Sequence, residues 1–461
     1  PGVFRPNPRP ITPPRPLIRR QPRNYPSPAT GFSRRKADRS CILRSPCFRF
    51  RCPHHSSCPN RANPLPSRQY GLGYDNAGNR LAVNHTGLGG DDDTYTSNPL
   101  NQYSTWTNRK LTMAGTAAAT SRVLVEGQPA LAPRQGSFWA QQITRPENSP
   151  AWAGELRIDA ANAAGSVRTS TVAVKMASTP QNFGYDDDGN LTSDGIWDYA
   201  YDAENRLYYM ATDTAAVTAG FPNRAIYFKY DYLGRRVSKQ VADGGAEVSC
   251  RKYLYDGWNL VAEYDAAGGA APGPLLRSYT WGLDLAGSLS ATGGVGALLE
   301  IADHPSGKTY FPTYDGGGNI VSLVNAASGA LAAVYEYNPF GEPLRTQTLD
   351  PTVADQPFRF STHATDLETG LVYYGLRYYS PSLGRFVNRD PIEEAGGLNL
   401  YGFAGNNPVN ALDVLGMIPT TSMDQIWNEE QPNDSFVKLY HPDWIKVENS
   451  SWYERAKGVM S

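Results

Sequence analysis

The sequence from Pro357 to Met417 reads PFRFSTHATDLETGLVYYGLRYYSPSLGRFVNRDP and continues IEEAGGLNLYGFAGNNPVNALDVLGM. It is dense in Tyr, Phe, Gly, Asn and Pro, which recur at short intervals. Aromatic side chains fit a pleated surface, whereas Gly, Asn and Pro supply the backbone angles of tight turns. The stretch therefore predicts short strands joined by turns, and an all-β fold.

N-terminal to this stretch, a Tyr-Asp unit recurs at spacings of roughly 20 to 30 residues, which is typical of a repeat architecture. Most copies continue with Gly or Asn and then an aliphatic residue. The copies begin at Tyr74, Tyr185, Tyr201, Tyr230, Tyr255, Tyr264 and Tyr314. We expect each unit to be a strand that ends in Tyr, a turn capped by Asp, and a left-handed residue before the next strand. Glycan contact by exposed Tyr rings is the alternative role.

Alternation of apolar and polar residues predicts strands between these turns, for example at 225–230 and 334–337. Residues 96–180 lack the Tyr-Asp unit but contain three strand-like pieces, at 121–126, 154–159 and 170–175. A small inserted all-β module, such as a sandwich, fits this pattern.

Two tryptophans in the insertion, Trp139 and Trp152, are core anchors or a carbohydrate platform. Burial in the core is the favoured role for both, because large aromatic side chains dominate burial in small β cores.

Residues 1–68 are rich in Pro and Arg, with 15 of the 36 Pro residues of the chain. Such a segment buries too little apolar surface to offset the entropy of ordering, so we predict disorder. Cys41, Cys47, Cys52 and Cys58 are separated by five, four and five residues. This spacing differs from paired C-x2-C knuckles even with His54 and His55 nearby, so no metal site and no cofactor are predicted.

Charge is distributed unevenly along the chain, although the net value is −1. Residues 1–68 hold 15 basic residues and one acidic residue, which leaves 28 basic and 43 acidic residues beyond. An acidic body argues against a nucleic-acid partner. No run of roughly 18 apolar residues and no signal peptide is visible.

The stretch 357–417 resembles the Rhs repeat-associated core, which ends the YD-repeat shell of Rhs polymorphic toxins and of the Tc toxin C component. The resemblance rests on segments in the family's order and spacing. They are Glu368-Thr369-Gly370-Leu371, Arg377-Tyr378-Tyr379, Gly384-Arg385-Phe386, Asp390-Pro391-Ile392, Gly397-Leu398-Asn399-Leu400-Tyr401 and Asn406-Asn407-Pro408-Val409-Asn410. Ser380, Glu393 and Val414 depart from the usual residues of that pattern.

The resemblance implies a spiral of YD-repeat β-hairpins that forms part of a hollow shell, closed by the core as a plug. The predicted layout has six parts, which are given in chain order. They are a disordered extension at 1–68, a YD repeat at 69–95, the inserted module at 96–180, further YD repeats at 181–356, the core at 357–417, and a variable tail at 418–461 that is a truncated or decayed effector.

Asp390 and Asp413 are the one constellation suited to chemistry. Two carboxylates in a dry pocket share a proton, so that one activates water while the other polarises a carbonyl. Arg389 would support the geometry or a developing oxyanion. By resemblance the two Asp residues perform aspartyl-type self-cleavage, and the bond cut joins Met417 to Ile418. The alternative is that both are turn caps, which their spacing alone favours.

Two functions remain open at this point. The first is an Rhs-type shell that encapsulates and releases a C-terminal effector in toxin delivery or intercellular competition. Its partners would be its own C-terminal segment and an upstream shell portion or delivery machinery. The second is a non-enzymatic YD-repeat surface protein that binds carbohydrate or a protein partner. Either one implies a secreted or cell-surface location, by resemblance.

The disorder predicted for 1–68 has a direct test in limited proteolysis of the full chain. We expect the protease to remove this segment while the remainder survives, because Pro-rich and Arg-rich sequence leaves no core to pack. A protease-resistant arm, or cooperative zinc uptake by Cys41 to Cys58, would contradict the prediction.

Overall fold

A computed structural model describes residues 41–44, 69–84, 93–268, 273–289, 292–417 and 421–422. This part of the chain is nearly all β, and every pair of neighbouring strands is antiparallel, so the all-β prediction is confirmed. The one described α-helix is α1 (Thr214–Thr218). None of the helices described is long and apolar enough to cross a membrane.

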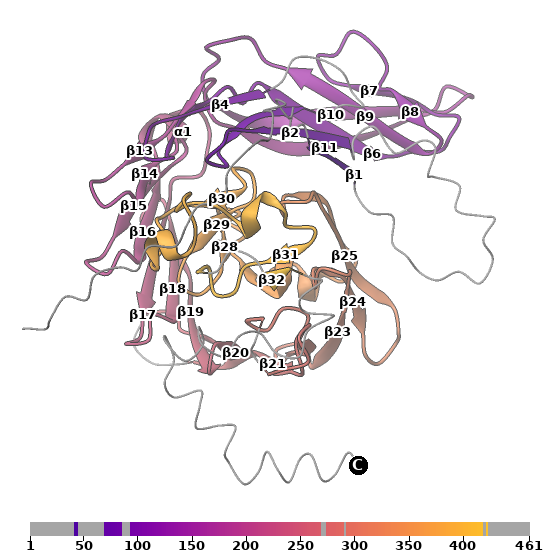
Figure 1. The fold of residues 1–461 in the computed structure, drawn as a ribbon. Coiled ribbons are helices and arrows are strands. Elements are labelled where there is room, and N and C mark those ends of the chain that lie inside the picture. Colours follow the sequence, from indigo (N-terminus) through magenta and orange to yellow (C-terminus); the bar gives the residue numbers. More distant parts are fainter. Residues whose placement is uncertain are drawn as a thin grey trace, which may run out of the picture. The chain divides into compact units, whose positions relative to one another are not determined.

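A 14-stranded sheet is the largest element (Figure 1). Its strands follow one another in chain order, as expected of stacked hairpins. They are β13 (Gly184–Tyr185), β14 (Leu191–Ser193), β15 (Trp197–Tyr201), β16 (Leu207–Thr212), β17 (Arg224–Tyr230), β18 (Arg236–Asp243), β19 (Ala246–Asp256), β20 (Asn259–Asp265), β21 (Leu275–Trp281), β22 (Leu298–Asp303), β23 (Lys308–Tyr314), β24 (Ile320–Asn325), β25 (Leu331–Tyr337) and β26 (Pro343–Thr348).

A six-stranded sheet precedes it in the chain. Its strands are β1 (Cys41–Arg44), β2 (Gln69–Tyr74), β3 (Arg80–Asn84), β4 (Asp93–Ser97), β5 (Tyr103–Trp106) and β12 (Gln181–Asn182). β1 lies within the segment predicted to be disordered, and the prediction is wrong for these four residues. The apolar run Cys41-Ile42-Leu43 favours a strand beside β2. The other residues of 1–68, including Cys47, Cys52 and Cys58, lie outside the described part.

Two three-stranded sheets share one hydrophobic cluster between β5 and β12 in the chain. Their strands are β6 (Lys110–Thr116), β7 (Arg122–Val125), β8 (Arg134–Gln135), β9 (Phe138–Thr144), β10 (Trp152–Ala161) and β11 (Val167–Met176). Trp139 is buried in this cluster, as predicted. Trp152 is 38% exposed, which corrects its assignment to the core, and its ring lies over Gly154.

Five of the seven Tyr-Asp units, those at Tyr74, Tyr185, Tyr201, Tyr230 and Tyr314, form turns of one kind. In the unit at Tyr185, the Asp186 carboxylate accepts the N–H of Asn190 at 2.8 Å, while Gly189 N donates to the Asp186 carbonyl at 3.0 Å. Gly189 has a φ of +85°, which favours glycine. The strand register shifts at the aromatic residue itself, as it does at Tyr201 and Tyr230. These bulges end each pairing and start the turn.

In several units the aromatic residue also bonds to the neighbouring hairpin. The Tyr337 hydroxyl donates to the carbonyl of Ile320 at 2.9 Å, and the Tyr255 hydroxyl donates to that of Arg236 at 3.0 Å. Trp281 replaces Tyr in one unit and donates its indole N–H to the Leu260 carbonyl at 2.7 Å. Each acceptor is the first or second residue of the strand that follows the preceding turn. The rings thus fasten one turn to the next along the sheet.

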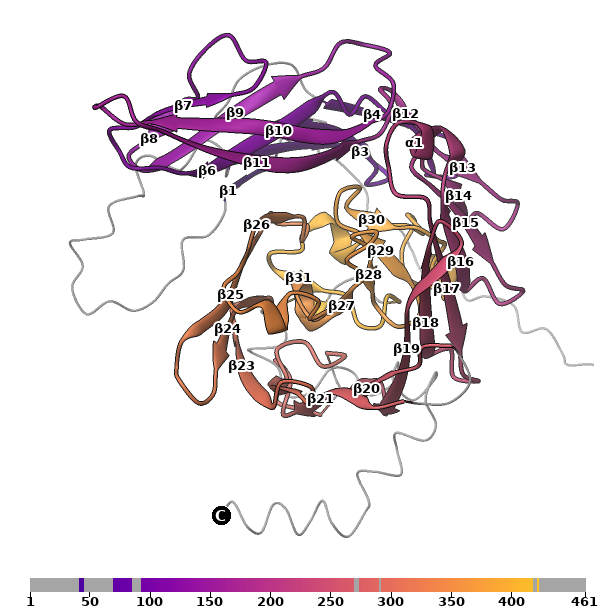
Figure 2. The ribbon, with the colours of Figure 1, turned by 180° about the vertical axis from the view of Figure 1, so that it is seen from behind.

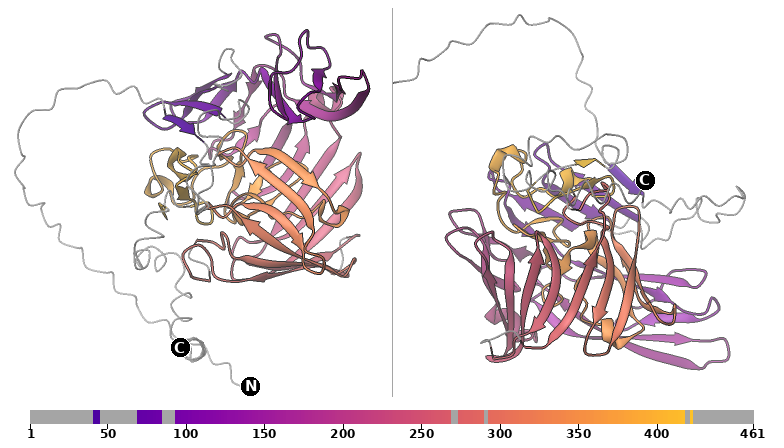
Figure 3. Two further views of the ribbon diagram at one scale, coloured as in Figure 1. Left: turned by 90° about the vertical axis from the view of Figure 1, so that its right-hand side faces the viewer. Right: turned by 90° about the horizontal axis from the view of Figure 1, so that it is seen from below.

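The core region is built from short strands, β27 (Ala364–Thr365), β28 (Val372–Tyr373), β29 (Tyr378–Ser380), β30 (Arg385–Phe386) and β31 (Ala411–Leu412), with β32 (Thr421–Ser422) beside β31. The 3₁₀ turns are η2 (Pro351–Val353), η3 (Phe360–Thr362), η4 (Glu393–Ala395) and η5 (Ala404–Asn406). The long sheet curves around this region in Figures 1 and 2, and Figure 3 shows the core gathered toward one end of the strands.

The core reaches the sheet through the glycine carbonyls of the turns. Asn406 donates to Gly78 O at 2.9 Å, and the Tyr401 hydroxyl donates to Gly189 O at 2.7 Å. Thr362 donates to a third such carbonyl, that of Gly318. Apolar contacts accompany these bonds. Two clusters combine residues of the long sheet with residues of 357–417, and a third joins Leu72 of the six-stranded sheet to the same stretch. Hydrophobic packing therefore joins the repeats to the C-terminal stretch.

A buried ion pair adds to this contact. Arg236 of β18 lies 2.6 Å from Asp366, and both side chains are almost fully buried. Lys239 lies 2.9 Å from the other oxygen of the same carboxylate. Burial alone would raise the pKa of Asp366, but the two cations outweigh it and lower that pKa.

Replacing Asp366 with Asn should destabilise the chain, because it leaves Arg236 buried without its counter-charge. We expect a loss of about 3 to 5 kcal/mol at neutral pH. A carboxyl with a lowered folded pKa stabilises the fold above its unfolded pKa, and this stability is lost as the pH falls through the folded pKa. The difference between wild type and variant should therefore shrink in acid. Urea unfolding across pH measures it, and a difference independent of pH would contradict the prediction.

Candidate functional site

Asp390 lies four residues after the end of β30, at the start of a tight turn. One of its carboxylate oxygens accepts the N–H of Ile392 at 3.0 Å. Asp390 therefore caps this turn, which is the alternative role considered from the sequence. The other oxygen lies 2.8 Å from the guanidinium of Arg377. The same carboxylate therefore caps a turn and forms a buried ion pair.

Asp413 follows β31 directly and is brought to the same guanidinium. Its carboxylate lies 3.8 Å from the Arg377 Nη2 that also binds Asp390. The Arg377 and Asp413 side chains are each 1% exposed. The structure thus brings the two predicted carboxylates together around one cation.

Arg377 is the residue that the sequence interpretation missed. Its Nη1 donates to the carbonyl of Leu400 at 3.0 Å, and its Nε donates to the carbonyl of Gly416. The guanidinium also lies 3.7 Å from the centre of the Phe386 ring. It was named from the sequence only as part of the Arg-Tyr-Tyr segment. A buried Arg beside two Asp residues far away in the sequence has no local pattern that would have revealed its role.

Burial shifts the two charged groups that face each other. It raises the pKa of Asp390 above its usual value, although Arg377 and the Ile392 N–H act in the opposite direction. Burial likewise lowers the pKa of Arg377, against the pull of Asp413 and Asp390. A raised pKa suits Asp390 to hold a proton that it can donate.

Arg389 is not brought to this cluster. Its side chain lies beside Gly189 and Tyr401, where a Cβ on Gly189 would lie 2.5 Å from Arg389 Cδ. Its supporting role at the site stays a prediction.

The bond predicted to be cut begins beside the cluster. Met417 is buried and follows Gly416, whose carbonyl Arg377 holds. Ile418 lies outside the described residues. β32 then pairs with β31, which places Thr421 opposite Leu412, the residue before Asp413.

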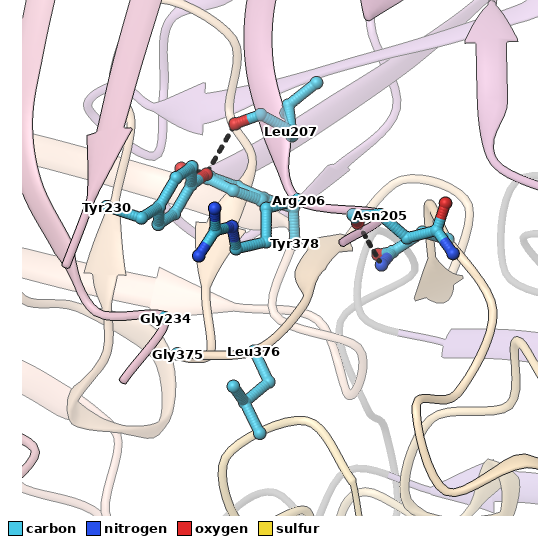
Figure 4. Close-up of a pocket in the computed structure, with 9 residues that line it drawn as sticks. Asn205, Arg206, Leu207, Tyr230, Gly234, Gly375, Leu376 and Tyr378 are labelled. Carbon is cyan, nitrogen blue, oxygen red and sulfur yellow. Dashed lines mark hydrogen bonds between the residues drawn. The ribbon is translucent and has the colours of Figure 1, made fainter. Parts of the chain in front are cut away.

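A narrow crevice lies where the turns of the sheet meet this part of the core (Figure 4). It is lined by Asn205, Arg206, Leu207, Tyr230, Gly234, Gly375, Leu376, Tyr378 and Asn388. Leu376 and Tyr378 flank Arg377 in the chain, and the other lining residues include turn residues of the long sheet. Turns of the sheet therefore lie close to the residues that carry Arg377. Among the described residues, no group of three or more His, Cys, Asp or Glu is arranged to hold a metal ion.

The fold and the site together define the class: a repeat sheet packed around a C-terminal core with an Asp-Arg-Asp cluster. The chain matches no protein-family model. It is 33% identical over 240 residues to the tRNA nuclease WapA of Bacillus subtilis, and the matched region covers 51% of this chain and 9% of that protein. It is 29% identical to the double-stranded DNA deaminase toxin A of Burkholderia cenocepacia, over 51% of this chain and 17% of that protein.

Further relatives point the same way. The probable deoxyribonuclease RhsB of Dickeya dadantii is 29% identical over 57% of this chain and 17% of its own length. By these relatives, the chain is an Rhs/Tc-like protein, as predicted. It spans about a tenth to a sixth of the length of these three relatives. Among solved structures, the Tc holotoxin pore of Photorhabdus luminescens is similar at 16% identity, with a TM-score of 0.42 over 78% of this chain and 17% of that one.

Removing Arg377, the cation that both carboxylates share, should destabilise the fold. Arg377→Ala leaves two buried carboxylates without a counter-charge, so we expect the free energy of unfolding to fall by about 3 to 5 kcal/mol at neutral pH. The loss should shrink in acid, where the carboxylates bind protons. Arg389→Ala is the matched control, since that side chain lies beside Gly189 and Tyr401. Equal losses in urea unfolding of the two variants would contradict the ion-pair assignment.

Proposed function

We propose that the chain is the C-terminal part of an Rhs-type shell that cleaves itself after Met417 and so releases the segment that follows. The observation that carries this proposal is the buried cluster in which Arg377 contacts Asp390, Asp413 and the carbonyl of Gly416. The Rhs/Tc relatives suggest a role in toxin delivery or competition. Its partners would be its own C-terminal segment and an upstream shell portion or delivery machinery, in a secreted or cell-surface setting.

The chemistry would be hydrolysis of the Met417–Ile418 peptide bond. Protonated Asp390 hydrogen-bonds to the carbonyl oxygen of Met417, while ionised Asp413 takes a proton from the attacking water. The water oxygen adds to the carbonyl carbon, and the bond to nitrogen breaks as that nitrogen accepts the proton that Asp413 took from the water. The products are a carboxyl group on Met417 and an amino group on Ile418. Arg377 lies beside both carboxylates and donates to the carbonyl of Gly416, the residue that precedes Met417.

The carbohydrate-binding alternative finds less support. It depends on repeat Tyr rings that are free to meet a sugar, whereas the hydroxyls of Tyr230, Tyr255, Tyr314 and Tyr337 donate to backbone carbonyls of the sheet. These four residues are committed to holding neighbouring turns together.

Intact-mass analysis of the full chain tests the proposal. We expect wild type to lose residues 418–461, whereas Asp390→Asn and Asp413→Asn should stay intact, because each removes the carboxyl that donates or accepts the proton. The rate should fall as the pH rises through the raised pKa of Asp390, since the acid form is then lost. A wild-type chain that stays whole for days at mildly acid and neutral pH would overturn the proposal.

A glycine next to the pair offers a subtler test. A Cβ on Gly396 would lie 2.5 Å from a carboxylate oxygen of Asp390, so Gly396→Ala should push this carboxylate away from Arg377. We expect cleavage to slow at least tenfold with every charged group retained. Gly316→Ala is the control, because a Cβ there meets nothing within 4 Å and its φ is not positive. Cleavage of the Gly396 variant at the wild-type rate would show that the position of Asp390 is not critical.

A further inference from the structure

A small apolar cluster surrounds the residues that lead to the proposed cut. It comprises Ile392, Val414, Leu415 and Met417, all buried, with Trp258 and Leu376 packed against it. Five of these six residues belong to the core. Trp258 alone comes from the long sheet, in the turn between β19 and β20.

Trp258 meets the two core segments that carry the site. A Cβ on Gly375 would lie 3.2 Å from the Trp258 ring and 3.3 Å from Leu415, so all three are in close contact. Leu376 N donates to the Leu415 carbonyl at 3.2 Å, which ties the segment before Arg377 to the segment before Met417. The indole ring therefore lies against the junction from which both Arg377 and Met417 extend.

Other turns of the sheet support the same junction. A Cβ on Gly234 would lie 3.5 Å from Leu376, and one on Gly293 would lie 3.6 Å from Val414. The Trp258 turn is itself held by Arg235, which donates to the Gly257 carbonyl at 2.6 Å. The apolar wall behind the site is thus completed by the repeat sheet.

We propose that Trp258 is a positioning residue for self-cleavage, through which the sheet sets the placement of Arg377 and Met417. This inference rests on the proposed function. It implies that the site is complete only when the core is docked on the sheet, so that an unassembled shell does not cut itself. It also assigns Met417 to an apolar subsite, which favours a large apolar side chain before the cut.

The test is a comparison of cleavage rates in the full chain. Trp258→Ala should slow cleavage at least tenfold, and Trp258→Phe should restore most of the rate, because a ring still fills the space beside Leu415. If Trp258→Ala does not fold, Trp258→Leu takes its place: it retains an apolar side chain but lacks the ring, so its cleavage should also be slower than that of Trp258→Phe. Trp197→Ala is the matched control, since Trp197 packs against a different cluster.

Coupling separates positioning from general destabilisation. The effects of Trp258→Ala and Met417→Ala on the logarithm of the rate should be non-additive, whereas those of Trp197→Ala and Met417→Ala should add. Additive effects in the first pair, or equal slowing by the Trp197 and Trp258 variants at equal melting temperature, would overturn the inference. A wild-type chain that is not cut would overturn the proposed function, and with it this inference. Wild-type cleavage with an unaffected Trp258→Ala variant would overturn the inference alone.

Discussion

A hydrogen bond from a repeat aromatic residue to a carbonyl beyond the preceding turn is the interaction on which the long sheet depends. It is made by Tyr230, Tyr255, Trp281, Tyr314 and Tyr337. A hairpin alone has only a marginal stability in water, and its neighbour must hold it in register. The bonds of Tyr255, Trp281 and Tyr337 fix the turn ends of successive hairpins to one another. The glycine at the left-handed position then leaves its carbonyl available to the core. The core can therefore dock only where the turns are already aligned.

Docking of this kind makes the sheet and the core interdependent. The core strands have only two or three residues each, which is too few for independent stability. Their side chains instead join clusters with residues such as Leu298 and Ile226 of the long sheet. Arg236 adds a buried charge that is satisfied only when Asp366 of the core is in place. An unpaired charge in that position would be costly, so the pair also specifies how the core is oriented.

The sequence predicted the all-β fold and the turns because these depend on local chemistry: Asp caps a turn, Gly takes a positive φ, and Tyr ends a strand. It did not predict the turn at Asn98, where Asn replaces Asp and accepts the N–H of Gln102 at 3.1 Å. Nor did it predict the exposed ring of Trp152, because burial depends on which face of β10 packs. The candidate carboxylates were found by pattern, but Arg377 was not, since its partners lie 13 and 36 residues away. The domain boundaries stay predictions.

Two non-glycine residues with positive φ show how strongly the site is held. Glu393 has a φ of +52° and Leu415 one of +59°, and each lies within three residues of one of the two carboxylates. Such angles cost roughly 1 to 2 kcal/mol each for residues with a side chain. The 2.8 Å ion pair of Asp390 with Arg377 and the burial of Leu415 offset this cost. Glu393 stands where the related pattern often has Gly, yet Asp390 still reaches Arg377. Glu393 in place of Gly therefore strains the turn without separating Asp390 from Arg377, because the buried guanidinium lies against both Asp390 and Asp413.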